Sequence, residues 1–211
     1  MSAKRLLGIV VPLVLLVCNG WGQVNDVGIT AGRTFVSTQT VLNSGLSFNP
    51  TLHFGNEESV AFNYSRLLTS KGIFGIRAEV PAAIYFRMDL NTAYHGIPKD
   101  IGALFVTPAL RVNFFSGDNV TPWVSVGGGY GRFRYAPTLN FYGNNPGPGG
   151  GNTGVAEFGA GLDVWFWRNL GARLEVRDFY SGAPDLNVTT SISRQHNYYA
   201  GVGVMYRFER F

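Results

Sequence analysis

Nine charged residues recur within apolar, alternating segments of the sequence, and these are the groups that could do chemistry. Five are basic and four are acidic: Arg77, Glu79, Arg111, Glu157, Asp163, Arg173, Glu175, Arg177 and Arg207. Side chains two residues apart on a β-strand share a face, so this spacing gathers the charges on one side of several strands. A buried charge without a partner costs several kcal/mol. We therefore predict a network of ion pairs, with a gated proton or ion path as the alternative.

The positions of two residues in the sequence predict one ion pair of this network. Asp163 and Arg173 are nearly symmetric about the turn at Arg168-Asn169, so adjacent strands should place them side by side. A short repeat, Gly-x-Arg-x-Glu-Val, begins at Gly75 and again at Gly171. Glycines on the charged face are expected to make room for the long arginine side chains; they are Gly127, Gly129, Gly159, Gly161, Gly201 and Gly203.

Cofactor and metal chemistry have little support in the sequence. The glycine run that starts at Gly127 has Arg132 where a dinucleotide-binding loop needs its third glycine, and no helix follows it. The histidines, His53, His95 and His196, are scattered in or beside expected loops, whereas a metal site needs convergent ligands. We expect no cofactor and no metal.

The charged face must be positioned by strands, and eight segments show the period of two that is typical of strands. In the last of them Tyr198, Ala200, Val202, Val204, Tyr206 and Phe208 share an apolar face. The apolar face runs for about ten residues, which is the length that a tilted strand needs to cross a bilayer. The eight segments are 27–36, 59–68, 74–86, 103–115, 122–135, 156–167, 170–177 and 198–208.

The connections between these strands alternate between long and short. Residues 69–72, 116–119 and 168–169 are short turns. The long connections are 37–58, 87–99, 136–153 and 181–195, and the third is rich in glycine and proline, which predicts an irregular, mobile loop. Short periplasmic turns and long outer loops are the rule for bacterial outer-membrane barrels. The pattern predicts an all-β fold, an eight-stranded antiparallel transmembrane up-and-down β-barrel.

Aromatic residues gather where the strands should meet the two membrane surfaces. We expect Phe114, Trp123, Phe166 and Phe208 in a lower belt, and Phe86, Tyr130 and Tyr198 in an upper belt. A soluble lipocalin-like barrel is the alternative, with its apolar face inside. The belts and the leader described next favour an apolar face that contacts lipid.

Residues 1–22 have the features of a secretory signal peptide. Lys4 and Arg5 precede an apolar segment, and Gly20-Trp21-Gly22 supplies a cleavage site before Gln23. A lipoprotein signal ending at Cys18 is the alternative. Residues 23–211 would then form one barrel domain without cysteine. That domain has 15 basic and 13 acidic residues and no basic run interleaved with aromatics, so we expect no nucleic-acid binding.

The end of the chain, Gly203 to Phe208, resembles the terminal signal of outer-membrane barrels, a glycine followed by two alternating aromatics. In this resemblance Gly203, Tyr206, Phe208 and the terminal Phe211 are read by the barrel assembly machinery. The chain as a whole is similar to the transmembrane domain of outer-membrane protein A. The resemblance implies the outer membrane of a Gram-negative cell envelope and contact with lipid and lipopolysaccharide. The chain departs from that relative in that we expect no peptidoglycan-binding domain after the barrel, so anchoring of the cell wall is not carried over.

For function we expect a non-enzymatic, monomeric barrel with a structural or adhesive role and a possible surface ligand bound through its loops. Two alternatives stay open. Lipid A deacylases resemble this chain in size and use a His-x-Ser pair, but here Tyr198 follows His196 where the serine would be. The second alternative is a narrow, porin-like channel.

Overall fold

The computed structural model describes residues 24–42, 45–48 and 50–209, and every regular element in these ranges is a β-strand. The predicted signal peptide and Phe211 lie outside them. Across the described ranges, no helix is both long and apolar enough to cross a membrane. The strands are β1 (Val24–Val36), β2 (Gln39–Leu42), β3 (Thr51–Phe54), β4 (Glu57–Lys71), β5 (Phe74–Asn91), β6 (Asp100–Val106), β7 (Ala109–Phe114), β8 (Val120–Tyr135), β9 (Gly150–Trp165), β10 (Leu170–Gly182), β11 (Thr189–Thr190) and β12 (Arg194–Glu209).

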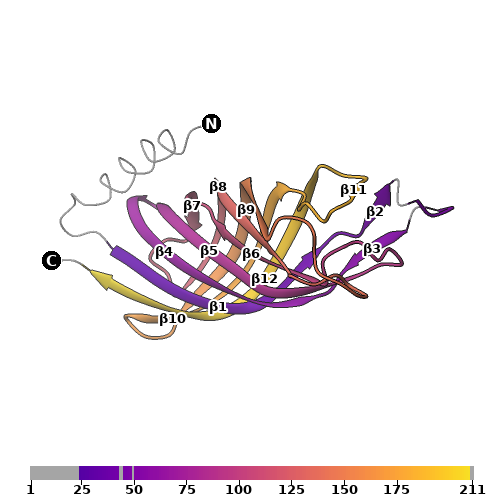
Figure 1. Cartoon of the computed structure of the whole chain (residues 1–211). Helices are drawn as coiled ribbons and strands as arrows, with labels where there is room; N and C mark the ends of the chain where they lie inside the picture. Colours follow the sequence, from indigo (N-terminus) through magenta and orange to yellow (C-terminus); the bar gives the residue numbers. More distant parts are fainter. Residues whose placement is uncertain (1–23, 43–44, 49, 210–211) are drawn as a thin grey trace.

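The long strands close into an antiparallel barrel (Figure 1). β1 pairs with β4 on one side and with β12 on the other, so the first and last strands meet. β6 and β7 follow each other in the same place, and both lie between β5 and β8. If β6 and β7 are counted as one interrupted strand, the ring contains eight strands. The predicted up-and-down barrel is confirmed.

The apolar faces of the long strands point outward. Val202 on β12 is 61% exposed and Leu174 on β10 is 59% exposed, whereas Glu175, the next residue, is 1% exposed. Apolar outer positions continue around the ring through Ile29, Phe62, Ile76, Leu110, Val126 and Phe158. A contiguous apolar surface of this kind is not stable in water, and a barrel that lies in lipid requires it.

The fourth predicted strand is interrupted, because Thr107 and Pro108 separate β6 from β7. Proline has no N–H to donate to the ladder. Pro81 of the adjacent strand accepts a hydrogen bond from the Thr107 N–H at 3.1 Å, and Pro108 accepts one from Gly128 at 3.1 Å. The neighbouring strands thus remain connected across the break. The prediction of one continuous strand from 103 to 115 was wrong.

The strands also extend beyond the predicted bounds at the end where the long loops lie. Residues 87–91 continue β5 and are not part of a loop, and the connection 37–58 contains β2 and β3. The loop between β8 and β9 has an irregular backbone, but hydrogen bonds hold it, including Asn145 N–H to Pro137 O at 2.8 Å. These segments cover a buried apolar cluster that includes Val41, Leu52, Leu90, Ile97 and Leu186.

Candidate functional site

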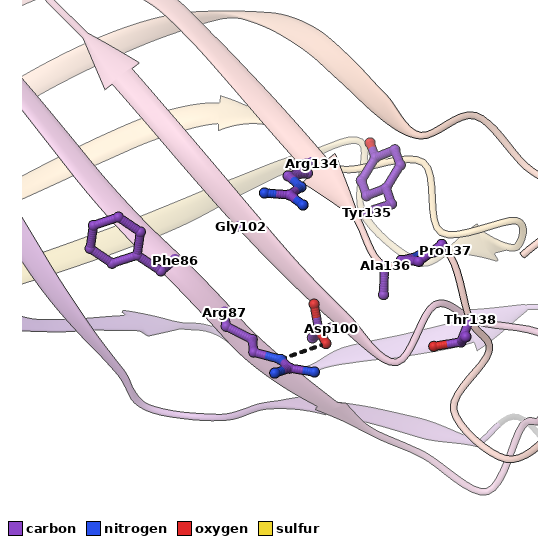
Figure 2. A pocket seen from close by; sticks show the side chains of 9 residues that line it. All are labelled: Phe86, Arg87, Asp100, Gly102, Arg134, Tyr135, Ala136, Pro137 and Thr138. Carbon is purple, nitrogen blue, oxygen red and sulfur yellow. Dashed lines mark hydrogen bonds and ion pairs between the residues drawn. The ribbon is translucent and has the colours of Figure 1, made fainter.

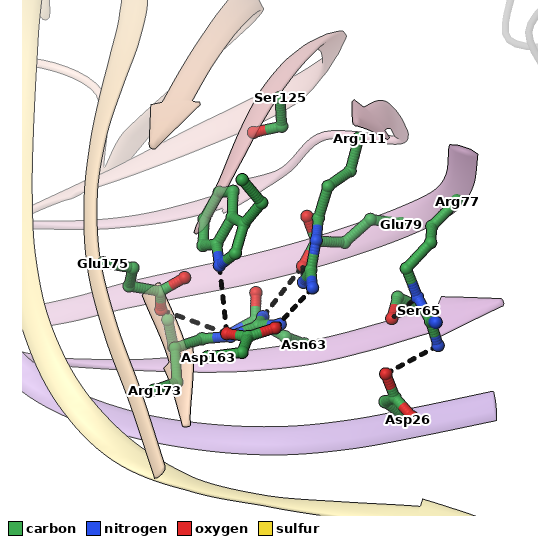
Figure 3. A network of polar contacts seen from close by, with 12 residues as sticks. Asp26, Asn63, Ser65, Arg77, Glu79, Arg111, Ser125, Asp163, Arg173 and Glu175 are labelled. Atoms are coloured by element: carbon green, nitrogen blue, oxygen red, sulfur yellow. Dashed lines mark hydrogen bonds and ion pairs between the residues drawn. The ribbon is translucent and has the colours of Figure 1, made fainter. Parts of the chain in front are cut away.

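The eight side chains predicted to form the inner network, Arg77, Glu79, Arg111, Glu157, Asp163, Arg173, Glu175 and Arg177, are all at most 3% exposed. They come from β5, β7, β9 and β10, and Figure 3 labels six of them, all except Glu157 and Arg177. Ion pairs join seven of them into one network, which we call the charged layer, whereas Arg77 pairs with Asp26 instead.

Arg173 and Asp163 are direct cross-strand neighbours on β10 and β9. The Arg173 Nε lies 2.8 Å from Asp163 Oδ1, and its Nη2 lies 3.0 Å from Oδ2. This two-point geometry is the strongest form of an arginine–carboxylate pair. Asp163 also accepts hydrogen bonds from Arg111 and from the indole Nε1–H of Trp123, the latter at 3.0 Å.

Glu79 connects the two sides of the lumen. Its Oε1 lies 2.9 Å from Arg173 Nη1, 3.2 Å from Arg177 Nη2 and 3.3 Å from Arg111 Nη1. β5, which carries Glu79, is not a neighbour of β10, which carries Arg173 and Arg177. The contacts therefore cross the interior, and they cross-link the barrel in addition to its backbone ladder.

Arg177 is the second branch point. It contacts Glu157 at 2.7 Å and Glu175 at 2.9 Å. Glu175 in turn accepts a hydrogen bond from the Thr30 hydroxyl of β1 at 2.6 Å. Gly159 makes room here as expected, because a Cβ at this position would lie 3.3 Å from Arg177 Nη1 and 2.6 Å from Glu157 Oε1.

One further acid, Asp26, belongs to the lumen; it lies outside the predicted first strand, which begins at Val27, whereas β1 begins at Val24. Asp26 is buried and lies 2.6 Å from Arg77 and 3.0 Å from Arg207. Its position, two residues before Gly28 on the inward face of β1, was visible in the alternation. Together with Asp26, the ion-paired arginines and carboxylates of the lumen number five each, and their formal charges cancel.

The prediction that Trp123 belongs to the lower aromatic belt was wrong. Trp123 is 1% exposed and points inward, since its neighbour Val124 occupies an outward position of β8. The guanidinium carbons of Arg111, Arg173 and Arg177 lie 4.7, 5.1 and 4.9 Å from the centre of its ring. Cation–π attraction strengthens when the groups are removed from water. Trp123 is therefore an apolar and electrostatic anchor of the charged layer.

An apolar layer lies above the charged layer, toward the long loops. Phe105 stacks on Phe179 at 5.2 Å between ring centres and meets Phe133 edge-on at 6.0 Å. Tyr85 and Tyr199 belong to the same buried cluster. The lumen thus contains two packed layers, one charged and one apolar. A cavity of about 200 Å³ lies at the short-turn end, where Arg77, Asn113 and Arg207 contribute to its lining.

The residues of the predicted assembly signal lie along the seam between β12 and β1. Gly203 pairs with Thr30, and a Cβ on Gly203 would collide with the backbone of Ile29. Tyr206 is exposed on the outer face, and Phe208 is partly buried. Glycine at position 203 therefore permits the close approach of the strands that close the barrel.

A second polar group faces outward near the loop end of β10 and β12. The His196 Nδ1 lies 2.6 Å from Asp178 Oδ2, and its ring packs between Tyr180 and Tyr198. A carboxylate that orients an imidazole is one part of a hydrolytic triad. His95 stacks on Phe141 instead. In the part of the chain that the structure describes, no three histidine or acidic side chains converge as metal ligands.

Comparisons with known proteins identify the fold. No protein-family model and no curated protein sequence matches the chain. Among solved structures, OprG of Pseudomonas aeruginosa matches with a TM-score of 0.55 at 12% identity, covering 90% of this chain and 99% of OprG. The N-terminal β-barrel domain of OprF from the same organism gives 0.51 at 15% identity, covering 90% and 100%. AlkL, determined in lipid bilayers, gives 0.53 at 14% identity, covering 91% and 93%. This chain therefore has the fold of the small outer-membrane β-barrels.

Proposed function

We propose that this protein is a non-enzymatic outer-membrane barrel, closed to solutes, that makes contacts through its outer loops in a structural or adhesive role. The observation that carries the proposal is the filled lumen. The seven ion-paired side chains of the charged layer occupy one level of the lumen, and a cluster of aromatic rings occupies the next. With the interior closed, the loops are the part of the described chain that is placed to meet molecules outside the cell.

The loop surface has the character of a contact surface. Tyr142 is 91% exposed, and Phe141, Leu46 and Phe48 are exposed beside other loop residues. Exposed apolar side chains that gather in loops mark sites of interaction. The backbone that carries Tyr142 is held by a hydrogen bond from Leu139 N–H to Gly143 O at 3.0 Å, so the aromatic tip is presented by an ordered turn.

Exchanging the aromatic tip for serines, Phe141→Ser with Tyr142→Ser, is expected to lower the attachment of cells that produce the barrel to an apolar polystyrene surface severalfold. The reason is the loss of exposed aromatic area at the outer surface. The matched control is Phe166→Ser with Trp167→Ser, two exposed aromatics in a short turn at the opposite end of the barrel. Equal attachment by the tip variant and the unmodified protein would contradict the proposal.

The absence of enzymatic activity is tested at His196. Purified protein incubated with lipopolysaccharide should leave the acyl chains intact, because Tyr198 stands where an acyl-transfer nucleophile would be. Mass spectrometry of the lipid measures this. Released fatty acid that disappears in His196→Ala would show that the His196–Asp178 pair acts as a catalytic base, and the protein would then be a lipid A-modifying enzyme.

The proposal includes a monomer that is inserted by the barrel assembly machinery. A closed ring leaves no barrel strand with an unpaired edge, which removes the usual route to pairing with a second copy. Gly203, Tyr206 and Phe208 supply the terminal pattern that the machinery would recognise, on a strand that pairs with every residue of β1.

A further inference from the structure

A basic patch interrupts the outer surface of β8 directly above its apolar band. The outward positions of this strand run Val124, Val126, Tyr130, Arg132 and Arg134 from the short-turn end toward the loops, and all five are exposed. Alternate residues on one strand face are about 6.8 Å apart. The two arginines therefore lie one above the other, next to the aromatic residue that marks the membrane surface.

A hollow opens beside Arg134, and Arg87 and Asp100 also line it (Figure 2). Arg134 pairs across the ladder with Gly102 of β6, and a Cβ on Gly102 would lie 2.7 Å from the Phe86 carbonyl oxygen, so the glycine lets β5 approach closely here. On the far side of Gly102 the register of β5 shifts at Phe86 and Arg87, and both of these side chains line the hollow. The hollow has a volume of about 570 Å³. Two guanidinium groups thus stand on either side of a glycine.

Of the arginines in and beside this hollow, only one is paired with a carboxylate. Arg87 is paired with Asp100, with Nε and Oδ2 2.9 Å apart. Neither Arg132 nor Arg134 makes an ion pair with another of the described residues. Elsewhere on the barrel, the arginines of the lumen are all matched with carboxylates. The patch therefore carries uncompensated positive charge at the outer surface of the membrane, which is the charge complement of a phosphate.

We infer that Arg132, Arg134 and the adjoining hollow form a binding site for a phosphate group of lipopolysaccharide in the outer leaflet. Arginine binds phosphate with two parallel hydrogen bonds and is preferred where such recognition is needed. Below the arginines, Val126 and Tyr130 provide a surface for acyl chains, and Phe86, 66% exposed, forms the other wall. The lipid would thus contact the barrel with its charged and its apolar parts together.

This site depends on the position of the barrel in the membrane and not on the proposed role of the loops. In the experiment, lipopolysaccharide is titrated into the purified barrel in a non-ionic detergent at low and high salt. Replacing the two unpaired arginines, Arg132→Gln with Arg134→Gln, should weaken binding about tenfold or more, because two charge-assisted contacts are lost. Binding by the unmodified barrel should weaken with salt.

The control variant is Lys71→Gln with Arg168→Gln, which removes two exposed cations at the other end of the barrel and should bind like the unmodified protein. Both variants should unfold at the same temperature as the parent, since the changed side chains are exposed.

Lipopolysaccharide stripped of phosphate should bind weakly, and millimolar inorganic phosphate should not displace the intact lipid. Equal binding by the Arg132 and Arg134 variant, or by the stripped lipid, would overturn the inference. Full displacement by inorganic phosphate would assign the site to a free anion instead.

Discussion

Arg173→Ala is expected to lower the free energy of unfolding of the barrel by about 3–5 kcal/mol, which is the usual cost of removing one partner from a buried ion pair. Arg173 is fully buried and is shared by Asp163 and Glu79, which come from strands on different sides of the lumen. Its loss leaves carboxylate oxygens inside the barrel with fewer donors. Denaturant unfolding of the barrel in lipid vesicles measures the change.

Arg87→Ala is the matched control, because it breaks an ion pair that is exposed. The Arg87 side chain is 65% exposed, and its contact with Asp100 is a single hydrogen bond. Exposed pairs contribute roughly 0–1 kcal/mol. A loss of stability in Arg173→Ala no larger than that in Arg87→Ala would mean that the charged layer does not cross-link the barrel.

Trp123→Ala is expected to cost about 3–5 kcal/mol, the range for removing a large aromatic side chain from a packed interior. The indole lies against three arginines and donates to Asp163, so its removal leaves both a cavity and an unmatched acceptor. Trp123→Phe separates the two effects. It keeps a ring beside the guanidinium groups but loses the N–H, and should cost about 1–3 kcal/mol.

Trp167→Ala serves as the comparison for both changes. Trp167 is 68% exposed in the turn between β9 and β10 and should contribute little in the same unfolding experiment. If Trp123→Phe were as unstable as Trp123→Ala, the hydrogen bond to Asp163 would account for the whole effect. If both behaved like Trp167→Ala, Trp123 would not be an anchor of the charged layer.

The barrel itself could be predicted from the sequence because a period of two is a local signal. In each long strand the alternation of residue types shows which face is apolar. In β10, Leu174 and Val176 on the outer face alternate with Arg173 and Glu175 on the inner face. The cross-strand pair of Asp163 and Arg173 also followed locally, from their distances to a short turn. Orientation of the faces required further signals, the aromatic belts and the terminal pattern.

Contacts between distant strands were not visible in the same way. Glu79 meets Arg173 across the lumen, a contact between residues 94 positions apart in the chain. Trp123 was assigned to the membrane surface by residue type, although its place in the alternation of β8 made it inward. The alternation of inward and outward positions along β8 and β1 places both Trp123 and Asp26 in the lumen, whatever location their residue types usually favour.

The loop end was the least predictable part of the fold. β2, β3 and β11 have only two to four residues, too few for a periodic pattern to emerge. They are specified by partners elsewhere in the chain, as in the pairing of β11 with β2. The apolar layer that they help to cover is formed by side chains of β5, β6, β8 and β10. Because these strands are far apart in the chain, no single segment of the sequence predicts the layer.

The most direct test of a closed lumen is the conductance of the unmodified barrel in a planar lipid bilayer. The charged layer and the apolar layer together predict no steady single-channel current across the membrane. Insertion can be verified independently by the resistance of the reconstituted strands to protease. Steady, large single-channel currents from the unmodified protein, unchanged in Arg173→Ala, would contradict the account, because they would show that ions pass a lumen that the side chains do not fill.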